Sequence, residues 1–153
     1  MNKTLWPALT LLTLSPALAA TGEVLDATPA TLVQVLRSAG YQPTLKPGDA
    51  KTSPSIQVGS GEDTVWLYFS GCKAGVCTRV TASNGFEVGQ DSAELGPMLA
   101  KWNADWYTQA YLDKDGAYLD GTYLLQGGYT RANFVAWFKT YLNELAEFEN
   151  TLP

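Results

Sequence analysis

Apolar residues recur at helical spacing in two segments of the chain. In the first segment, Thr28 is a suitable N-cap, Pro29 suits a first helical turn and Gly40 suits a left-handed stop. The apolar stripe between them consists of Leu32, Val35, Leu36 and Ala39. The second segment follows Thr130, another suitable N-cap, and its stripe consists of Phe134, Phe138, Tyr141, Leu142, Leu145, Phe148 and Leu152. The pattern predicts one helix in each segment.

Between these helices the pattern changes to short runs of β-branched and aromatic residues. Thr64–Ser70 and Thr78–Ser83 are two such runs, and the intervening Gly71–Val76 predicts a hairpin connection. A second hairpin is predicted from Trp106–Asp113 and Ala117–Leu125, with a turn at residues 114–116 and a stop at residues 127–128.

The remaining segments carry weaker patterns. Prolines and glycines interrupt residues 42–63, so at most a short strand, Ile56–Val58, is expected there. Asn84–Gly85 indicates a turn, and Ala93–Asn103 indicates a helix with Pro97 near its first turn. The predicted order is therefore α-β-β-β-α-β-β-α, an α+β fold in which helices cover an antiparallel sheet.

One stretch also resembles a known family. The residues from Trp102 to Gly116 read WN-x-x-WY-x-x-AYLD-x-DG, and they are followed by L-x-G-G at residues 125–128. Together with the Gly71–Cys72 pair in the preceding hairpin and the final amphipathic helix, this pattern resembles the YbjN domain family over about residues 28–152. The resemblance implies a fold like that of type III secretion chaperones, and a regulatory or sensory role.

The first residues have the features of a secretory signal. Lys3 supplies a positive charge, an apolar stretch follows, and Ala17-Leu18-Ala19 is a signal peptidase pattern. A membrane anchor is the alternative, but the stretch is interrupted by Pro7 and Pro16 and is shorter than the ~20 apolar residues that a spanning helix needs. We therefore predict a signal peptide over residues 1–19, a single domain over residues 20–153, and a periplasmic or extracellular protein without membrane insertion after cleavage.

Composition excludes several classes of function. The chain has no histidine and a formal net charge of −5, which disfavours nucleic acid and anionic lipid as partners. Cys72 and Cys77 lie at the mouth of the first hairpin, where an exported protein is expected to form a disulfide. The alternatives are a redox pair, whose usual spacing is shorter, and a metal site, which two thiolates fill only by half. No metal and no cofactor are expected.

Aspartates near the second hairpin raise the question of catalysis. The run from Asp113 to Gly116 could suggest a calcium loop, but its glycine is misplaced for an EF-hand and a tight turn fits better. Asp113, Asp115 and Asp120 could in principle act as acid and base. Exposed turn carboxylates lack the environment that such work requires, and no Ser-x-x-Lys motif is present. The sequence therefore predicts a protein that is not an enzyme and has no catalytic residues.

Aromatic residues are the remaining candidates for a functional surface. Strand alternation places Trp66 and Tyr68 on the sheet face opposite Val65, Leu67 and Phe69, and it places Tyr107 and Tyr111 together on one face. If helices cover only one face of the sheet, these four aromatics form a partner-binding surface; if both faces are covered, they are core. We expect an exported domain that binds a partner protein or peptide, or a second copy of itself as a homodimer. The alternative is a small-ligand sensor of the cell envelope.

Overall fold

The computed structural model describes residues 22–59, 64–88, 95–114 and 116–152. The predicted signal peptide lies outside these residues. In chain order the elements are β1 (Val24–Leu25), α1 (Pro29–Ser38), β2 (Pro43–Lys46), β3 (Ser55–Val58), β4 (Val65–Ser70), β5 (Arg79–Phe86), α2 (Leu95–Asp105), β6 (Gln109–Asp113), β7 (Gly116–Leu124), β8 (Tyr129–Thr130) and α3 (Arg131–Thr151). In the described part of the chain, no helix is long and apolar enough to span a membrane.

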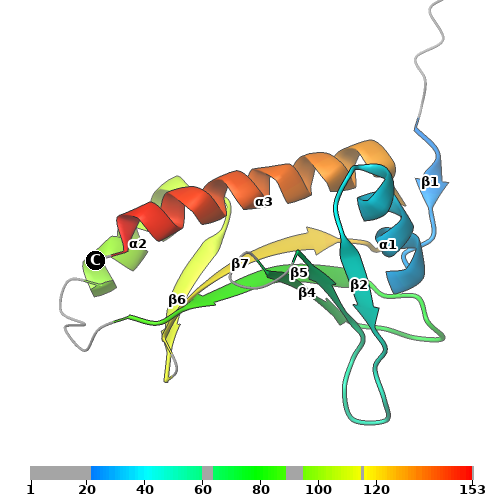
Figure 1. Ribbon diagram of the computed structural model, residues 1–153, viewed down its shortest axis with the longest axis horizontal. Helices are drawn as coiled ribbons and strands as arrows, with labels where there is room; N and C mark the ends of the chain where they lie inside the picture. The colour runs from blue at the N-terminus through cyan, green and yellow to red at the C-terminus, as the bar shows by residue number, and fades with distance from the viewer. Residues whose placement is uncertain (1–21, 60–63, 89–94, 115, 153) are drawn as a thin grey trace, which may run out of the picture.

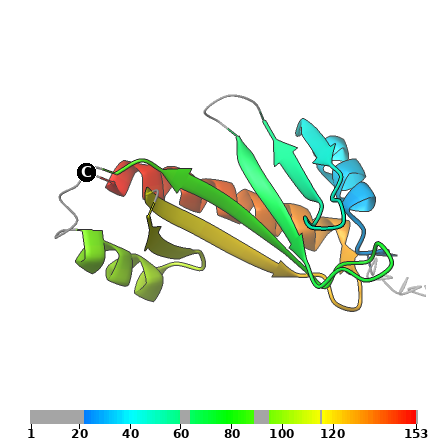
Figure 2. The same ribbon diagram turned by 90° about the horizontal axis from the view of Figure 1, so that it is seen from below.

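The main sheet is antiparallel and has the strand order β2-β3-β4-β5-β7-β6. The helices lie on one side of this sheet, and the long α3 runs across it (Figure 1). Seen from below, the strands lie in front of α3, and no helix of the described residues covers them (Figure 2). The fold is therefore the predicted α+β class, with one covered face and one bare face. The sheet curves so that the β2–β3 loop and the end of β6 both project from the bare side (Figure 1).

The two terminal helices form where the sequence predicts them. The Thr28 hydroxyl accepts a hydrogen bond from the Thr31 amide at 3.2 Å, which caps α1. The Thr130 hydroxyl accepts from the Asn133 amide at 3.3 Å, which caps α3. Each cap satisfies an amide that the first helical turn leaves without a partner.

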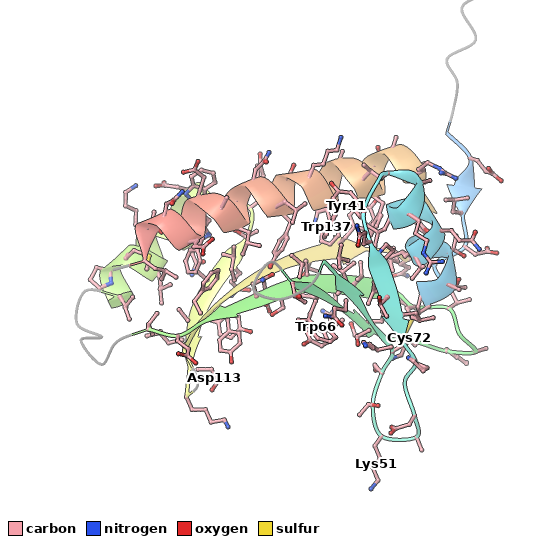
Figure 3. All side chains as sticks on the ribbon, viewed as in Figure 1. Tyr41, Lys51, Trp66, Cys72, Asp113 and Trp137 are labelled. Atoms are coloured by element: carbon pink, nitrogen blue, oxygen red, sulfur yellow. A yellow bond between two sulfur atoms is a disulfide. The ribbon has the colours of Figure 1, made fainter. Side chains whose placement is uncertain are left out.

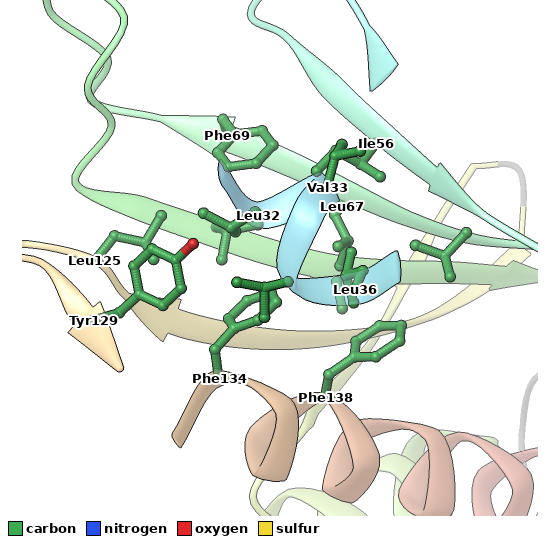
Figure 4. Packing of buried hydrophobic residues seen from close by; sticks show 14 of the residues in the cluster. Leu32, Val33, Leu36, Ile56, Leu67, Phe69, Leu125, Tyr129, Phe134 and Phe138 are labelled. Atoms are coloured by element: carbon green, nitrogen blue, oxygen red, sulfur yellow. The ribbon is translucent and has the colours of Figure 1, made fainter. Parts of the chain in front are cut away.

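Two apolar clusters hold the helices on the sheet. In the larger cluster, α1 and the first half of α3 pack on β3, β4 and β5, with side chains such as Leu36, Leu67 and Phe138 fully buried (Figure 4). In the smaller cluster, α2 and the end of α3 pack on β6 and β7 around Trp102 and Phe148. Because Phe134 and Phe138 belong to the first cluster and Phe148 to the second, α3 joins the two halves of the core.

The predicted element order omits three short strands. β2 lies at the edge of the sheet, and Pro43 is tolerated there because the first residue of an edge strand need not donate to a neighbour. β1 and β8 pair only with each other, through Val24 opposite Thr130 and Leu25 opposite Tyr129. Strands this short are specified by distant pairing partners rather than by their own patterns.

The predicted turn at Asn84–Gly85 is wrong, because β5 continues through both residues to Phe86. The Asn84 amide group donates to the Thr64 carbonyl at 2.9 Å and accepts from the Tyr141 hydroxyl at 3.0 Å. Gly85 is needed for close approach, since a Cβ atom there would lie 2.7 Å from the Tyr118 ring. Both residues therefore serve tertiary packing rather than a chain reversal.

Candidate functional site

The bare side of the sheet carries a group of aromatic side chains. In β4 the buried Val65, Leu67 and Phe69 alternate with Trp66 and Tyr68, which point away from the helices. Trp66 lies below the sheet and Trp137 above it (Figure 3). Alternation also puts aromatics of β6 and β7 on the bare side. We call this surface the open face, and its aromatic residues are Trp66, Tyr68, Tyr111 and Tyr118.

The aromatic rings of the open face stack in pairs. Tyr111 lies directly across from Tyr118 in the β6–β7 register, and their centroids are 5.5 Å apart with nearly parallel planes. Trp66 and Tyr68 are likewise nearly parallel, at 6.2 Å. Tyr68 is 49% exposed and Tyr111 is 38% exposed. The rings that the open face presents to solvent are therefore already ordered by stacking on one another. This order lowers the conformational entropy that the side chains lose when a partner binds.

Asp120 lies in the middle of these rings. It pairs across the sheet with Ser83, which in turn pairs with Trp66. Its Oδ2 accepts a hydrogen bond from the Tyr111 hydroxyl at 3.3 Å, whereas its Oδ1 is buried and has no hydrogen-bond partner in the described part of the chain. A buried acceptor without a donor is destabilising, and no basic side chain of the described residues pairs with this carboxylate, so its charge can attract a basic group of a bound partner.

Asp120 also affects the neighbouring phenols. Burial, followed by the negative charge of Asp120, raises the pKa of Tyr68 above its ordinary value. The same two causes, again with burial first, raise the pKa of Tyr111, and its hydrogen bond to Asp120 adds to the effect. Both phenols therefore keep their protons to a higher pH than a free tyrosine and remain hydrogen-bond donors.

Removing the charge of Asp120 should reverse part of this effect. In Asp120→Asn, the pKa values of Tyr68 and Tyr111 are expected to fall toward the ordinary value, because the repulsion of tyrosinate is lost while burial remains. Tyrosinate absorbance, followed during alkaline titration, measures the shift to lower pH. Glu149→Gln, an exposed change on α3, is the charge-matched control. A titration of Asp120→Asn that coincides with the parent's contradicts the assigned coupling.

A second feature is a recess of about 360 Å³ on the helix side of the sheet. It opens where β6 begins, since β7 beyond Asp120 has no partner from β6. Its walls come from α3, β7 and the segment before β6. The lining residues are Tyr107, Thr108, Gly121, Thr122, Trp137, Thr140, Tyr141 and Glu144. We call it the Glu144 recess.

Glu144 is the charged group of this recess and is only 4% exposed. Its Oε2 accepts a hydrogen bond from the Thr108 amide at 2.9 Å, and the Thr108 hydroxyl accepts from Trp102 Nε1 at 3.0 Å. Among the described residues, no group donates a hydrogen bond to Oε1, and no basic side chain forms an ion pair with the carboxylate. Glu144 therefore anchors the start of β6 with one oxygen and leaves the other without a partner.

Tyr107 does not share the open face with Tyr111, so the predicted placement of these two residues on one face is wrong. β6 begins only at Gln109, and strand alternation does not extend to a residue before the strand. The strand start is fixed by Asn103, whose side chain accepts from the Ala110 amide at 2.7 Å and donates to the Ala110 carbonyl at 2.9 Å. Tyr107, 95% exposed, instead forms part of the rim of the Glu144 recess.

Cys72 and Cys77 are joined as a disulfide across the turn between β4 and β5. Cys77 is buried in the larger core cluster, and its amide donates to the Ala27 carbonyl at 2.8 Å. Inside the loop, Lys73 and Val76 pair through two backbone hydrogen bonds. The disulfide thus closes this turn, and the Cys77 amide ties the turn to the segment that precedes α1.

Reducing this disulfide should have a moderate effect on stability. For so short a loop, the chain-entropy estimate is about 2 kcal/mol, so the reduced protein is expected to stay folded but unfold at lower denaturant concentration. Urea titrations with and without reductant measure the difference. The double variant Cys72→Ala, Cys77→Ala, titrated under the same two conditions, should show no response to reductant. Complete unfolding on reduction would contradict the estimate.

The carboxylates considered for catalysis do not converge. Asp113 Oδ1 accepts from the Lys114 amide at 2.7 Å, and Asp113 pairs with Gly116 in the β6–β7 register, which fits the tight turn expected for this segment. Asp115 lies outside the described residues, and Asp120 lies on the open face among tyrosines. Within the described ranges, no group of three or more acidic or cysteine residues is placed to hold a metal ion.

The comparisons with known proteins establish the family. Residues 28–153 match the YbjN family, whose description is "Putative bacterial sensory transduction regulator". The chain therefore belongs to the YbjN family. Among the solved structures, it is similar to YbjN from E. coli, described as "a putative transcription regulator", with a TM-score of 0.64 and 13% identity over 82% of this chain and 90% of the other. At this identity the likeness shows a shared fold. No curated protein matches the chain.

Proposed function

We propose that this chain is an exported, non-enzymatic regulatory domain whose open face binds a segment of a partner protein. The observation that carries the proposal is the open face itself, where four stacked aromatic rings surround a carboxylate with an unsatisfied oxygen. Exposed aromatic groups of this kind are typical of protein interfaces. The family description, which names sensory regulators, agrees with a domain that acts through a partner.

The shape and charge of the open face favour one kind of occupant. The β2–β3 loop, with Lys51 near its tip, and the end of β6 at Asp113 project on either side of it (Figure 3). A protein segment lying between them could place apolar groups on the rings and a basic group near Asp120. Because the chain is acidic, with a formal net charge of −5, and the central group is a carboxylate, we propose a partner segment that carries a basic side chain.

Capture experiments test this function. The mature chain, immobilised and exposed to the exported protein fraction, should retain a partner that Tyr68→Arg fails to retain, since the new charge repels a basic segment. Tyr107→Arg makes the same change on an exposed tyrosine away from the open face and should retain the partner. The retained protein, once identified by mass spectrometry and purified, should bind in a direct titration with the same order among variants. If the purified partner binds the parent and Tyr68→Arg with equal affinity, the proposal is contradicted. If the parent forms concentration-dependent dimers that Tyr68→Arg does not form, the occupant of the open face is a second copy of the chain.

Export rests on the N-terminal residues alone and needs its own test. The Ala17-Leu18-Ala19 pattern leads us to propose cleavage after Ala19 or one residue later, so the mature protein begins at Ala20 or Thr21. An oxidising destination agrees with the Cys72–Cys77 disulfide. The intact mass of the protein purified from its native host, under non-reducing conditions, is expected to lack residues 1–19 and two hydrogens. A full-length chain would show that no cleavage takes place.

The Glu144 recess favours a second function, that of a small-ligand sensor. Ligand sites are concave, mostly apolar and contain a few placed polar groups. The recess has aromatic walls, a hydroxyl from Thr140 and one buried carboxylate. It lies on the helix side of the sheet, so the two functions use different surfaces and can be tested separately.

A further inference from the structure

Glu144 is a nearly buried carboxylate in the lining of the recess. It is almost fully buried, and its one hydrogen bond, from the Thr108 amide, engages only Oε2. Buried charged groups are normally paired, because the loss of hydration is costly unless a counter-charge or several donors replace it. Here neither a basic residue nor a second donor from the described residues reaches Oε1.

The rest of the recess supplies what an organic cation needs. Its lining includes the rings of Trp137, Tyr141 and Tyr107, and it contains no basic residue. Aromatic faces attract cations through their quadrupoles, and the attraction is stronger where water is excluded. The volume of about 360 Å³ falls within the range of about 300–1,000 Å³ that is usual for small-molecule sites.

The Tyr141 ring is held in place by contacts outside the recess. Its hydroxyl donates to Asn84 Oδ1 at 3.0 Å or to the Leu119 carbonyl at 3.1 Å, so the phenol is committed to the sheet rather than to a ligand. Gly121 gives the ring its space, because a Cβ atom there would lie 2.6 Å from Tyr141 Cδ2. Trp137 contacts the Tyr123 and Phe134 rings at 5.3 Å each. The Trp137 and Tyr141 rings are therefore held in place by the fold itself.

We propose that the Glu144 recess binds a small organic ammonium ion. Its charge lies against Glu144 Oε1, and its carbon groups lie against Trp137, Tyr141 and the rim residue Tyr107. The proposal deepens the small-ligand function proposed above by naming the ligand class, and it does not depend on the open face. Both primary and quaternary ammonium ions have this chemistry, and the experiment separates them.

Calorimetric titration of the mature protein tests the proposal with matched ligands. Choline and 3,3-dimethylbutan-1-ol have the same shape and differ in charge, while n-butylammonium represents the primary amines. At least one of the two cations is expected to bind about tenfold or more tightly than the neutral alcohol. Tighter choline binding would assign the site to quaternary ions, and tighter n-butylammonium binding would assign it to primary amines. If neither cation exceeds the alcohol, the proposal is wrong.

Substitutions in and near the recess test whether the cation binds there. Glu144→Gln keeps an oxygen for the Thr108 amide but removes the charge, so it should abolish the preference for the cation over the alcohol. Glu147→Gln, an exposed change one turn away on α3, should leave the preference intact. Should Glu144→Gln fail to fold, Tyr107→Ala decides, because the Tyr107 side chain is exposed and its loss should weaken binding of the preferred cation severalfold without affecting the fold. The proposal is overturned if a folded Glu144→Gln binds the preferred cation as tightly as the parent does. If Glu144→Gln does not fold, the same result for Tyr107→Ala overturns it.

The outcome is independent of the partner experiment. Tyr68→Arg changes the open face and should leave ammonium binding unchanged, whereas Glu144→Gln should leave partner capture unchanged. Failure of one proposal therefore does not imply failure of the other.

Discussion

Replacing Phe138 with alanine is expected to lower the free energy of unfolding by ~3–5 kcal/mol. Phe138 is fully buried on α3, and its ring meets the Tyr41 ring edge-to-face at 5.0 Å (Figure 4). Its truncation removes apolar contacts and leaves a cavity between α3, α1 and the sheet. Because most domains have a total stability of only about 5–15 kcal/mol, the variant should be close to unfolding.

Chemical denaturation by urea measures this loss. Lys139→Ala is the control, since Lys139 is the next residue of the same helix and is exposed, and it should change the stability by no more than about 0.5 kcal/mol. If Phe138→Ala lies within about 1 kcal/mol of the parent, α3 does not pack on the sheet through this side chain.

The helices could be predicted because their patterns are local. In α3, the buried Phe134, Phe138 and Tyr141 recur at the spacing of one helix face, and a threonine cap precedes them. Neither signal depends on a distant segment. The strand β4 was predictable for the same reason, since its alternation of core and solvent residues is complete within six residues.

The elements that the sequence did not predict depend on distant partners. β1 and β8 are two residues each and exist because they pair with each other. Asn84 and Gly85 have the composition of a turn, but Tyr141 from α3 and Tyr118 from β7 give them different roles. Local propensity cannot anticipate contacts made by side chains that lie far along the chain.

In the candidate sites, too, local patterns were predictable and contacts with distant segments were not. Alternation placed Trp66 and Tyr68 correctly on the side opposite the core residues of β4, but it was extended to Tyr107, which precedes β6. Tyr118 and Asp120 were missed as members of the open face, although they alternate with the buried Ala117 and Leu119 in the same strand.

Glu144 was missed although a signal for it was present. It lies three residues after Tyr141 and four before Phe148, both of which are buried, so a carboxylate stands on the apolar stripe of α3. A charged residue at such a position is either paired or functional. What the sequence could not supply is the contact with Thr108, because that residue comes from the segment after α2.

Replacing Trp66 and Tyr68 together by serine is expected to weaken partner binding by about 2–4 kcal/mol, or roughly 30-fold or more. These side chains lie on the uncovered side of the sheet, and their stacked rings contact each other rather than the core. The cost to folding should therefore be about 1 kcal/mol, well below that of Phe138→Ala.

Affinity for the purified partner and urea denaturation of the same samples separate binding from stability. Tyr107→Ser is the matched control, because it removes an exposed aromatic group that lies off the open face, and it should change neither quantity appreciably. A double variant that loses several kcal/mol of stability would show that Trp66 and Tyr68 are part of the core. A stable double variant with undiminished affinity would place the partner on another surface. The expected result is weak binding with an intact fold. It would mean that the ordered aromatic rings of the open face serve recognition of the partner rather than folding.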